Sequence, residues 1–254
     1  MDKYNEDEFQ SVTVNLAQPR YTPPPLAKLV NVIGSLYCEQ YPVDLSMKYG
    51  TSGNEGYDYV VVDNVSRNTI FNINQVFFSF RGKRALLDSA GNPLVTIQRK
   101  TIFGSRWQVY KGDSTDDNDL LFKVEKSCMR ESSWTNLDVF LASNIEENIC
   151  DFKIKGGYTW ERSCVVYLGH SSVDIAQMHQ KCDSWNWRGE INGFNVVNVN
   201  PHVDYAFIIA LIMIFNAVNP RDHHGDTHDR ISSCEPAKDI SSCESNGVVC
   251  CKCD

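Results

Sequence analysis

The sequence lacks the apolar segment that a secretory signal peptide requires. Its first fifteen residues, "MDKYNEDEFQSVTVN", are acidic and contain no continuous apolar core. We therefore expect no export, a reducing compartment, and free thiols at most of the ten cysteines. The expected location is the cytoplasm, with peripheral attachment to a membrane and passage into the nucleus both left open.

An excess of basic residues is also absent, since the formal net charge is −8 at pH 7. A general nucleic-acid binder needs a basic face to neutralise phosphates, so we expect no general nucleic-acid binding. The sequence also lacks GxSxG, HExxH, P-loop and Rossmann motifs. We therefore expect no enzymatic activity and no cofactor.

Two local patterns resemble reactive or metal-binding sites but are typical of ordinary structure. Cys164 could pair with His170 or His179, yet it lies in the apolar run "ERSCVVY", which favours a small core residue. The acidic stretch "GDSTDDND" (112–119) lacks the alternating ligands, central Gly and final Glu of an EF-hand. We interpret it as a hairpin loop.

No apolar run in the sequence is long enough to cross a membrane as a helix. The most apolar stretch is "PHVDYAFIIALIMIFNAVNP" (201–220), whose uninterrupted part spans only Ala206 to Phe215. A spanning helix needs about 20 apolar residues. Pro201, an acidic residue in the first turn and Pro220 predict a helix over 203–218. A helix that is apolar on every side must be enclosed by other elements.

Short runs of alternating apolar and polar residues predict the strands that would enclose this helix. In "CDFKIK" (150–155) the apolar residues fall on one face and the polar residues on the other, which predicts a half-buried strand. Similar runs occupy 71–74, 107–110 and 121–126, and Asn192-Gly193 predicts a hairpin turn. Segments 59–75 and 84–100 resemble 137–156 and 163–181, which suggests a duplication and about twelve strands. The predicted fold is mainly β, a closed antiparallel barrel around one central hydrophobic α-helix.

This barrel domain is expected over residues 41–218, between two less regular segments. Residues 1–40 contain three consecutive prolines and predict an extended lead-in. Residues 219–254 are rich in Cys and His and predict a disordered tail. Its cysteines Cys250, Cys251 and Cys253 are candidates for acylation, which would anchor the chain at a membrane. A tail with no site and a metal-binding tail are the alternatives; the single CxxC is a weak metal signal, and no metal is expected.

Basic residues cluster in "RGKR" (81–84) and "QRKTIFGSR" (98–106). If neighbouring hairpins bring these segments together, their side chains could hold an anionic lipid head group through charge-assisted hydrogen bonds. The alternative is that they form the solvated outer face of strands. The candidate head-group ligands are Arg81, Lys83, Arg84, Arg99, Lys100 and Arg106.

Six blocks of the sequence resemble the plant LURP-one-related family, a branch of the tubby-like C-terminal superfamily. They are "PVDLSMK" (42–48), "LLDSAGNPLVTIQRK" (86–100), "RWQVYKGDS" (106–114), "CDFKIKGGYTWERSCVVY" (150–167), "IAQMHQK" (175–181) and "VNPHVDYAFIIALIMIFN" (199–216). The resemblance implies a twelve-stranded barrel around a hydrophobic helix, shared with the tubby domain and phospholipid scramblases. It provides no catalytic residues.

The same resemblance implies a regulatory or defence-related role, with phosphoinositides or other anionic membrane lipids as expected ligands. Two further hypotheses remain. One is a protein-interaction scaffold that binds no lipid, whose protein partners are unknown. The other is an enzyme with a small-ligand pocket at one end of the barrel, which the missing catalytic motifs disfavour.

Overall fold

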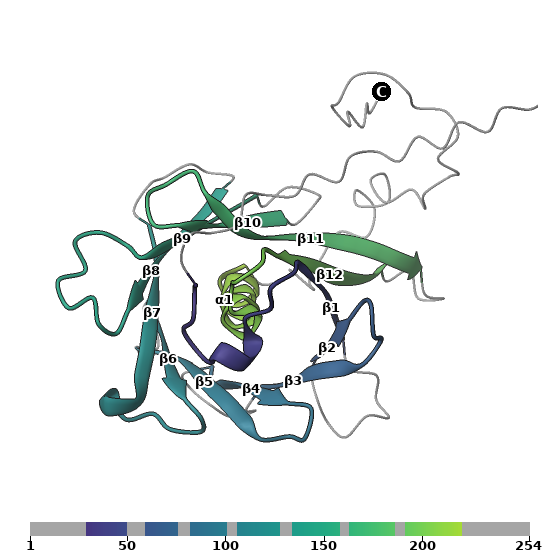
Figure 1. Cartoon of the computed structure of the whole chain (residues 1–254), viewed down its shortest axis with the longest axis horizontal. Coiled ribbons are helices and arrows are strands. Elements are labelled where there is room, and N and C mark those ends of the chain that lie inside the picture. Colours follow the sequence, from purple (N-terminus) through teal and green to yellow (C-terminus); the bar gives the residue numbers. More distant parts are fainter. Residues whose placement is uncertain are drawn as a thin grey trace, which may run out of the picture.

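The structure is a computed structural model, and it describes residues 29–49, 59–75, 82–100, 106–127, 134–157, 163–185 and 191–219. Within these ranges, twelve antiparallel strands form a closed barrel around one α-helix (Figure 1). Each strand pairs with its neighbours in sequence, and β1 closes the barrel against β12. The predicted fold class is confirmed.

The helices and strands have the following bounds. They are η1 (Ser35–Tyr37), β1 (Val43–Tyr49), β2 (Tyr59–Asp63), β3 (Thr69–Gln75), β4 (Arg84–Asp88), β5 (Pro93–Arg99), β6 (Arg106–Lys111), η2 (Asp117–Asp119), β7 (Leu120–Lys126), β8 (Trp134–Leu141), β9 (Phe152–Gly157), β10 (Ser163–Leu168), β11 (Asp174–Trp185), β12 (Ile191–Val199) and α1 (Tyr205–Val218).

The alternation seen in the sequence becomes the inner and outer faces of the barrel wall. On β9, Phe152 and Ile154 are buried, whereas Lys155, which follows Ile154, is exposed. The same period of two recurs on β7, where Phe122 and Val124 are buried. Burying a large apolar side chain contributes about 1.5–3 kcal/mol, so the inward face of each strand holds the wall against the helix.

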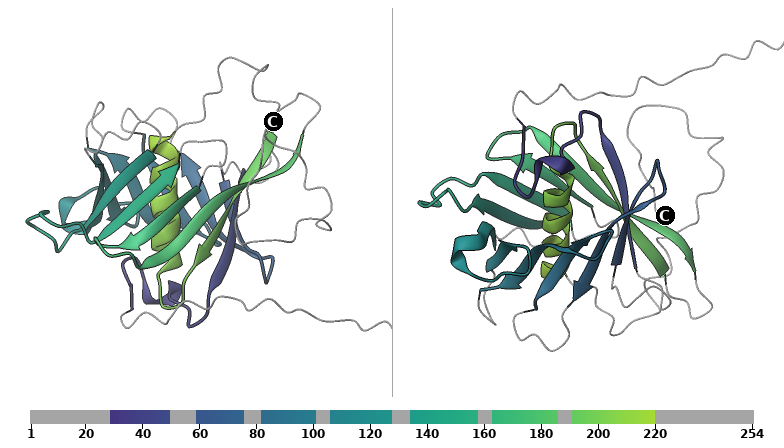
Figure 2. Two further views of the ribbon diagram at one scale, coloured as in Figure 1. Left: turned by 90° about the horizontal axis from the view of Figure 1, so that it is seen from above. Right: turned by 60° about the horizontal axis from the view of Figure 1, so that its bottom comes forward.

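The helix α1 runs along the axis of the barrel and is enclosed by strands (Figure 2). Every residue from 206 to 215 is buried, as the apolar stretch predicted. The ring of Phe207 packs edge-on against Phe122, and its centroid lies 4.9 Å from the centroid of the Phe152 ring. At the other end, a methyl group added to Gly156 would come within 2.3 Å of the Phe215 ring. Side chains of α1 therefore fill the lumen without room to spare.

The helix begins at Tyr205, two residues later than predicted. Val203 forms a β-bridge with Val30, so its backbone is extended and cannot join the helix. Asp204 is the N-cap, and its Oδ1 accepts a hydrogen bond of 3.0 Å from the Phe207 N–H. Among the described residues, no helix is both long and apolar enough to span a bilayer.

Residues 29–41 lie across the barrel end at which α1 begins, which we call the capped end (Figure 1). The Val30 N–H donates to the His202 carbonyl and the Asp204 N–H donates to the Val30 carbonyl. The second carboxylate oxygen of Asp204 accepts three backbone N–H groups, those of residues 32, 33 and 34, at 2.7–3.1 Å. Among the described residues, Val30 and residues 32–34 thus already contact the barrel, although they precede Tyr41, where the sequence predicted the domain to start.

One turn prediction is wrong. Asn192 and Gly193 lie inside β12, where they pair with Ser184 and Cys182 of β11. The hairpin between these strands continues past the Asn-Gly pair, so cross-strand hydrogen bonding overrides the local preference for a turn. The connection itself falls in residues 186–190, outside the described part of the chain.

Candidate functional site

Three of the candidate basic residues, Lys83, Arg84 and Arg99, lie at the barrel end where α1 finishes, which we call the basic end. Because neighbouring strands are antiparallel, the start of β4, the end of β5 and the start of β6 all lie at this end. Arg84 is the register partner of Ile97, and Arg99 follows two residues later on the same face. Arg84 and Arg99 are therefore diagonal neighbours on adjacent strands.

Arg84 points into the barrel and contacts the helix. Its Nη1 donates a hydrogen bond of 3.3 Å to the backbone carbonyl of Met213, in the C-terminal half of α1. The C-terminal end of a helix carries a partial negative charge, so a guanidinium at this position stabilises α1. Arg84 is half-buried, unlike a residue on the solvated outer face of a strand.

Arg99 is held by an aromatic ring. It faces Trp107 across the β5–β6 ladder, and its guanidinium carbon lies 4.9 Å from the centroid of the Trp107 ring. Trp107 is buried, so the stacked arrangement is fixed by the core below it. Gly82 adopts a positive φ of 58° beside the same ring, and Lys83 follows directly. Two arginines, a lysine and a tryptophan thus form the basic end.

The other three candidates are placed differently. Arg106 is on the outer wall, where its guanidinium binds Glu125 at 2.8 Å and Glu147 at 2.9 Å. Its charge is therefore compensated by two carboxylates. Lys100 is exposed and lines a cleft on the outer wall, and Arg81 lies outside the described residues. The six basic residues of the sequence therefore do not form one cluster.

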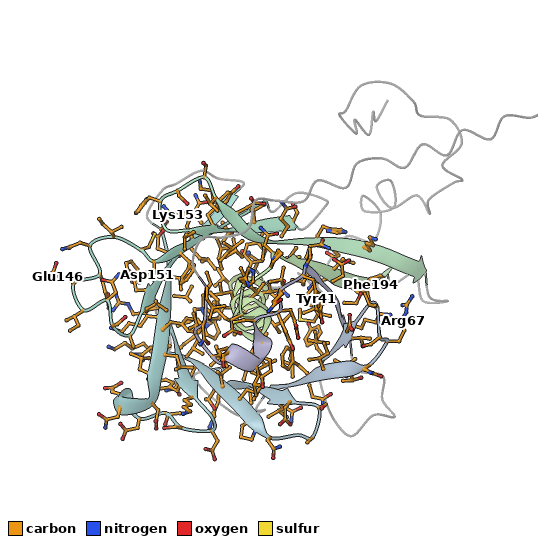
Figure 3. The ribbon with its side chains drawn as sticks, in the orientation of Figure 1. Tyr41, Arg67, Glu146, Asp151, Lys153 and Phe194 are labelled. Carbon is orange, nitrogen blue, oxygen red and sulfur yellow. The ribbon has the colours of Figure 1, made fainter. Side chains whose placement is uncertain are left out.

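The loop between β8 and β9 carries the partner of Arg106. Asp151 fixes this loop, because its Oδ2 accepts hydrogen bonds from the Leu141 N–H and the Asn144 side chain. Glu147 then reaches both Arg106 and Lys123, whereas Glu146 projects from the outer edge of the molecule (Figure 3). The hydrogen bond from Lys123 is the main cause that lowers the pKa of Glu147 below its usual value.

The proposed thiol–imidazole pairs of Cys164 do not form. Cys164 faces the core, and burial raises its pKa to about 12. His170 instead lies 3.6 Å from the sulfur of Cys150, and His179 is the register partner of Ser163. Burial also raises the pKa of Cys150, so its thiol stays protonated near neutral pH and is a poor nucleophile.

The acidic stretch 112–119 connects β6 to β7, as a hairpin loop should. Asp116 caps η2 and accepts hydrogen bonds from the backbone and side chain of Asn118. Within the described ranges, no group of three or more His, Cys, Asp or Glu side chains is arranged to hold a metal ion. The tail cysteines Cys250, Cys251 and Cys253 lie outside those ranges.

Sequence reasoning missed Trp107 and Met213 as parts of the basic end. Trp107 directly follows Arg106 in the sequence, yet the two side chains lie on opposite sides of the wall. The pairing of Arg99 with Trp107 depends on the register between β5 and β6. A sequence indicates register where a short hairpin of recognisable turn type joins the two strands. Contact between Arg84 and Met213 joins residues 129 positions apart, and no local pattern indicates it.

Comparison with known proteins gives the family. The LURP-one-related family model matches residues 43–216. This chain belongs to the LURP-one-related family. Protein LURP-one-related 15 of Arabidopsis thaliana is 40% identical over 205 residues, covering 80% of this chain and 92% of that protein. Protein LURP1 of Arabidopsis thaliana is 40% identical over 191 residues, covering 72% and 87%.

The fold also matches a solved structure. The X-ray structure of a protein from Arabidopsis thaliana is 38% identical, with a TM-score of 0.55. It covers 74% of this chain, and this chain covers 98% of it. The family resemblance read from the sequence blocks is therefore confirmed.

Proposed function

We propose that this LURP-one-related protein is a non-enzymatic regulator with a defence-related role that binds anionic lipid head groups, phosphoinositides included, at its basic end. The observation that carries the proposal is the stacked arginine: Arg99 lies over buried Trp107 and is the diagonal neighbour of Arg84, which Lys83 directly precedes in the chain. A chain with a net charge of −8 holds these three cations together at one end. Binding would place the protein at the cytoplasmic face of a membrane.

The chemistry of this arrangement suits phosphate. A guanidinium donates two parallel hydrogen bonds to a phosphate or carboxylate, and these charge-assisted bonds are stronger than neutral ones. Stacking on Trp107 fixes the plane of the Arg99 side chain before any ligand arrives, so less side-chain entropy is lost on binding. A lysine beside it adds a flexible point charge.

Charge reversal tests the proposal. We expect the full chain to sediment with phosphatidylcholine vesicles that contain 5% phosphatidylinositol 4,5-bisphosphate, and not with phosphatidylcholine alone. The double variant Lys83→Glu/Arg99→Glu should bind at least about tenfold more weakly, since two attractive charges become repulsive. Wild-type binding should also weaken with added salt, because exposed charges are screened.

The matched control is Arg67→Glu/Lys111→Glu, which changes the net charge equally at two exposed residues of the capped end. This control should bind vesicles nearly as well as the wild type. Equal loss in both double variants would show a general charge effect and contradict a site at the basic end. Absence of wild-type binding would remove the lipid proposal entirely.

A second function is favoured by the capped end. Seven large apolar side chains are exposed on the described segments and loops of this end: Leu29, Leu36, Tyr41, Val65, Ile145, Ile149 and Val173. A protein-interaction scaffold would use such a surface. Substitution of Leu36 and Ile145 by serine should then remove partners captured by the wild type, while Lys83→Glu/Arg99→Glu should keep them.

The tail cysteines offer an independent route to the membrane. Acylation of Cys250, Cys251 and Cys253 would add hydrocarbon chains, and two such chains anchor a protein where one does not. Hydroxylamine-sensitive acyl exchange on the full chain should label the tail if this proposal holds. Substitution of all three cysteines by serine should then abolish the label.

A further inference from the structure

The outer wall of the barrel carries a polar cleft that the proposed lipid site does not use. It has a volume of about 510 Å³ and lies between β5, β6 and the loop 112–119. Its lining residues are Gln98, Lys100, Gln108, Tyr110, Thr115, Asp116 and Asp117. A cleft of this volume is within the range that holds small molecules, about 300–1,000 Å³.

Strand register places two glutamines at the centre of this cleft. Gln98 and Gln108 are directly opposed on β5 and β6, and their neighbours Ile97 and Val109 face the core. The loop after β6 folds back toward them, because the Thr96 hydroxyl donates a 2.9 Å hydrogen bond to the Gly112 carbonyl. Gln98 is 8% exposed and Gln108 is 5% exposed, although both point outward from the barrel.

These buried amides retain hydrogen-bonding capacity. The Tyr110 hydroxyl donates to Gln108 Oε1 at 3.0 Å, and no described residue accepts a hydrogen bond from the Gln108 NH₂ group. No group in the described ranges hydrogen-bonds to the Gln98 amide, which also lines the cleft. Buried polar groups normally have partners, so two nearby amides with open positions indicate that solvent or a ligand completes them.

The charges around the cleft decide what kind of ligand fits. Neutral amide and phenol groups form the buried floor, whereas the charged residues lie at its exposed rim. Lys100, Asp116 and Asp117 supply charges of both signs there, and Asp116 already accepts two hydrogen bonds from Asn118. A charged ligand would lose hydration over a floor that offers no opposite charge, and this desolvation is unfavourable.

We propose that this cleft binds a neutral polyhydroxylated ligand of mono- or disaccharide size. A hydroxyl group both donates and accepts hydrogen bonds, as do the carboxamides of Gln98 and Gln108. Tyr110 is 2% exposed, so it closes the floor beneath the two amides and leaves hydrogen bonding as the main contact with the ligand. This site is separate from the basic end, so its occupancy does not require Lys83 or Arg99.

Saturation-transfer NMR on the full chain tests the proposal with named probes: glucose, galactose, sucrose and cellobiose as neutral sugars, with glucose 6-phosphate and glucosamine as charged comparisons. At least one neutral sugar should receive saturation from the protein and bind more tightly than its charged counterpart. Gln98→Ala and Gln108→Ala should each weaken that binding about tenfold, the effect of one or two lost hydrogen bonds.

The matched control is Gln177→Ala, an exposed glutamine on β11 whose side chain bonds only Asp174 among the described residues. It should leave sugar binding unchanged. Thr115→Trp provides a second test, because a large side chain at this exposed rim residue should block the cleft without disturbing the core. Circular dichroism would establish that each variant is folded.

Several outcomes would overturn the proposal. One is the absence of saturation transfer to all four neutral sugars. Another is sugar binding that survives Thr115→Trp in a folded protein. Tighter binding of glucose 6-phosphate or glucosamine than of glucose would show that the cleft selects charge rather than hydroxyl groups. Binding that is lost in Lys83→Glu/Arg99→Glu but kept in Gln98→Ala would move the site to the basic end.

Discussion

At each end of the barrel a charged side chain hydrogen-bonds to the backbone of α1, and the two side chains carry opposite charges. At the capped end, the carboxylate of Asp204 accepts the N–H groups at the start of α1 and of residues 32–34. At the basic end, the guanidinium of Arg84 donates to a carbonyl of the last helical turns. Both charges complement the helix dipole. At the basic end, Lys83 and Arg99 add further positive charge, which suits this end to anions, whereas the Asp204 carboxylate at the capped end is buried among backbone N–H groups.

The largest loss of stability is expected from a substitution in the middle of α1, the helix that runs between the two ends. Leu211 is fully buried in the middle of α1, and Leu211→Asp would place an unpaired charge in the apolar lumen. The penalty, about 3–5 kcal/mol or more, approaches the whole stability of a typical domain. We expect an unfolded protein by circular dichroism, with Asn216→Asp on the same helix as a folded control. A folded Leu211→Asp variant would contradict an enclosed helix.

The next effect should be confined to the capped end. Asp204→Ala removes the acceptor of four backbone N–H groups, and we expect a loss of about 3 kcal/mol in urea unfolding. Amide exchange at residues 32–34 should accelerate by more than exchange on β4 and β5. Asp204→Asn, which keeps one carbonyl acceptor, should lose less. Equal losses in the two variants would mean that shape, and not hydrogen bonding, holds the cap.

A smaller effect should appear at the basic end. Arg84→Met keeps the length of the side chain but removes the donor to Met213, and we expect destabilisation of about 1.5–3 kcal/mol. Arg84→Lys should recover part of the loss, because a cation remains near the C-terminal end of α1. The midpoint temperature of thermal unfolding, compared with that of the wild type, measures the change in stability of both variants. No change in Arg84→Met would indicate that the contact contributes nothing to the fold.

The smallest effect concerns the ion pairs that connect the two ends along the outer wall. The pKa of Glu147 is lowered from 4.5 by Lys123 and Arg106. Because the folded-state pKa lies below the unfolded one, this contribution is fully present above about pH 4.5 and is lost as pH falls through the folded value. Glu147→Gln should cost about 0.5–1 kcal/mol at pH 7 and almost nothing near pH 2.

The exposed neighbour Glu146 is the control for that measurement. Glu146→Gln should change the unfolding free energy little at either pH, since Glu146 accepts a 3.2 Å hydrogen bond from Asn148 on the exposed surface. A pH-independent loss in Glu147→Gln would show that packing of the loop matters more than its charge.

The barrel and its helix could be predicted because both depend on burial patterns that are local in the sequence. Period-two alternation at 150–155 and continuous apolar residues from 206 to 215 each report their own surroundings. The resembling segments 59–75 and 137–156 fall on β2–β3 and β8–β9, six places apart around the barrel. The proposed duplication stays a prediction, and this spacing supports it.

The candidate site could be predicted only in part. Lys83, Arg84 and Arg99 share one end, but the sequence cannot separate Arg106, because the side of the wall a residue faces depends on strand register. The cap was missed because Asp204 and its three donors are at least 170 residues apart. The Asn192-Gly193 error has the same origin, since pairing between β11 and β12 determines that backbone.

The pairing of the first strand with the last has a consequence for synthesis of the protein on the ribosome. The wall closes only when β12 meets β1, and α1 follows β12 in the chain. Nearly the whole domain must therefore leave the ribosome before its central core can assemble. Contacts so distant in sequence are slow to form, and partly closed barrels expose apolar strand faces in the meantime. This nascent chain should depend on chaperones until residue 219 has emerged.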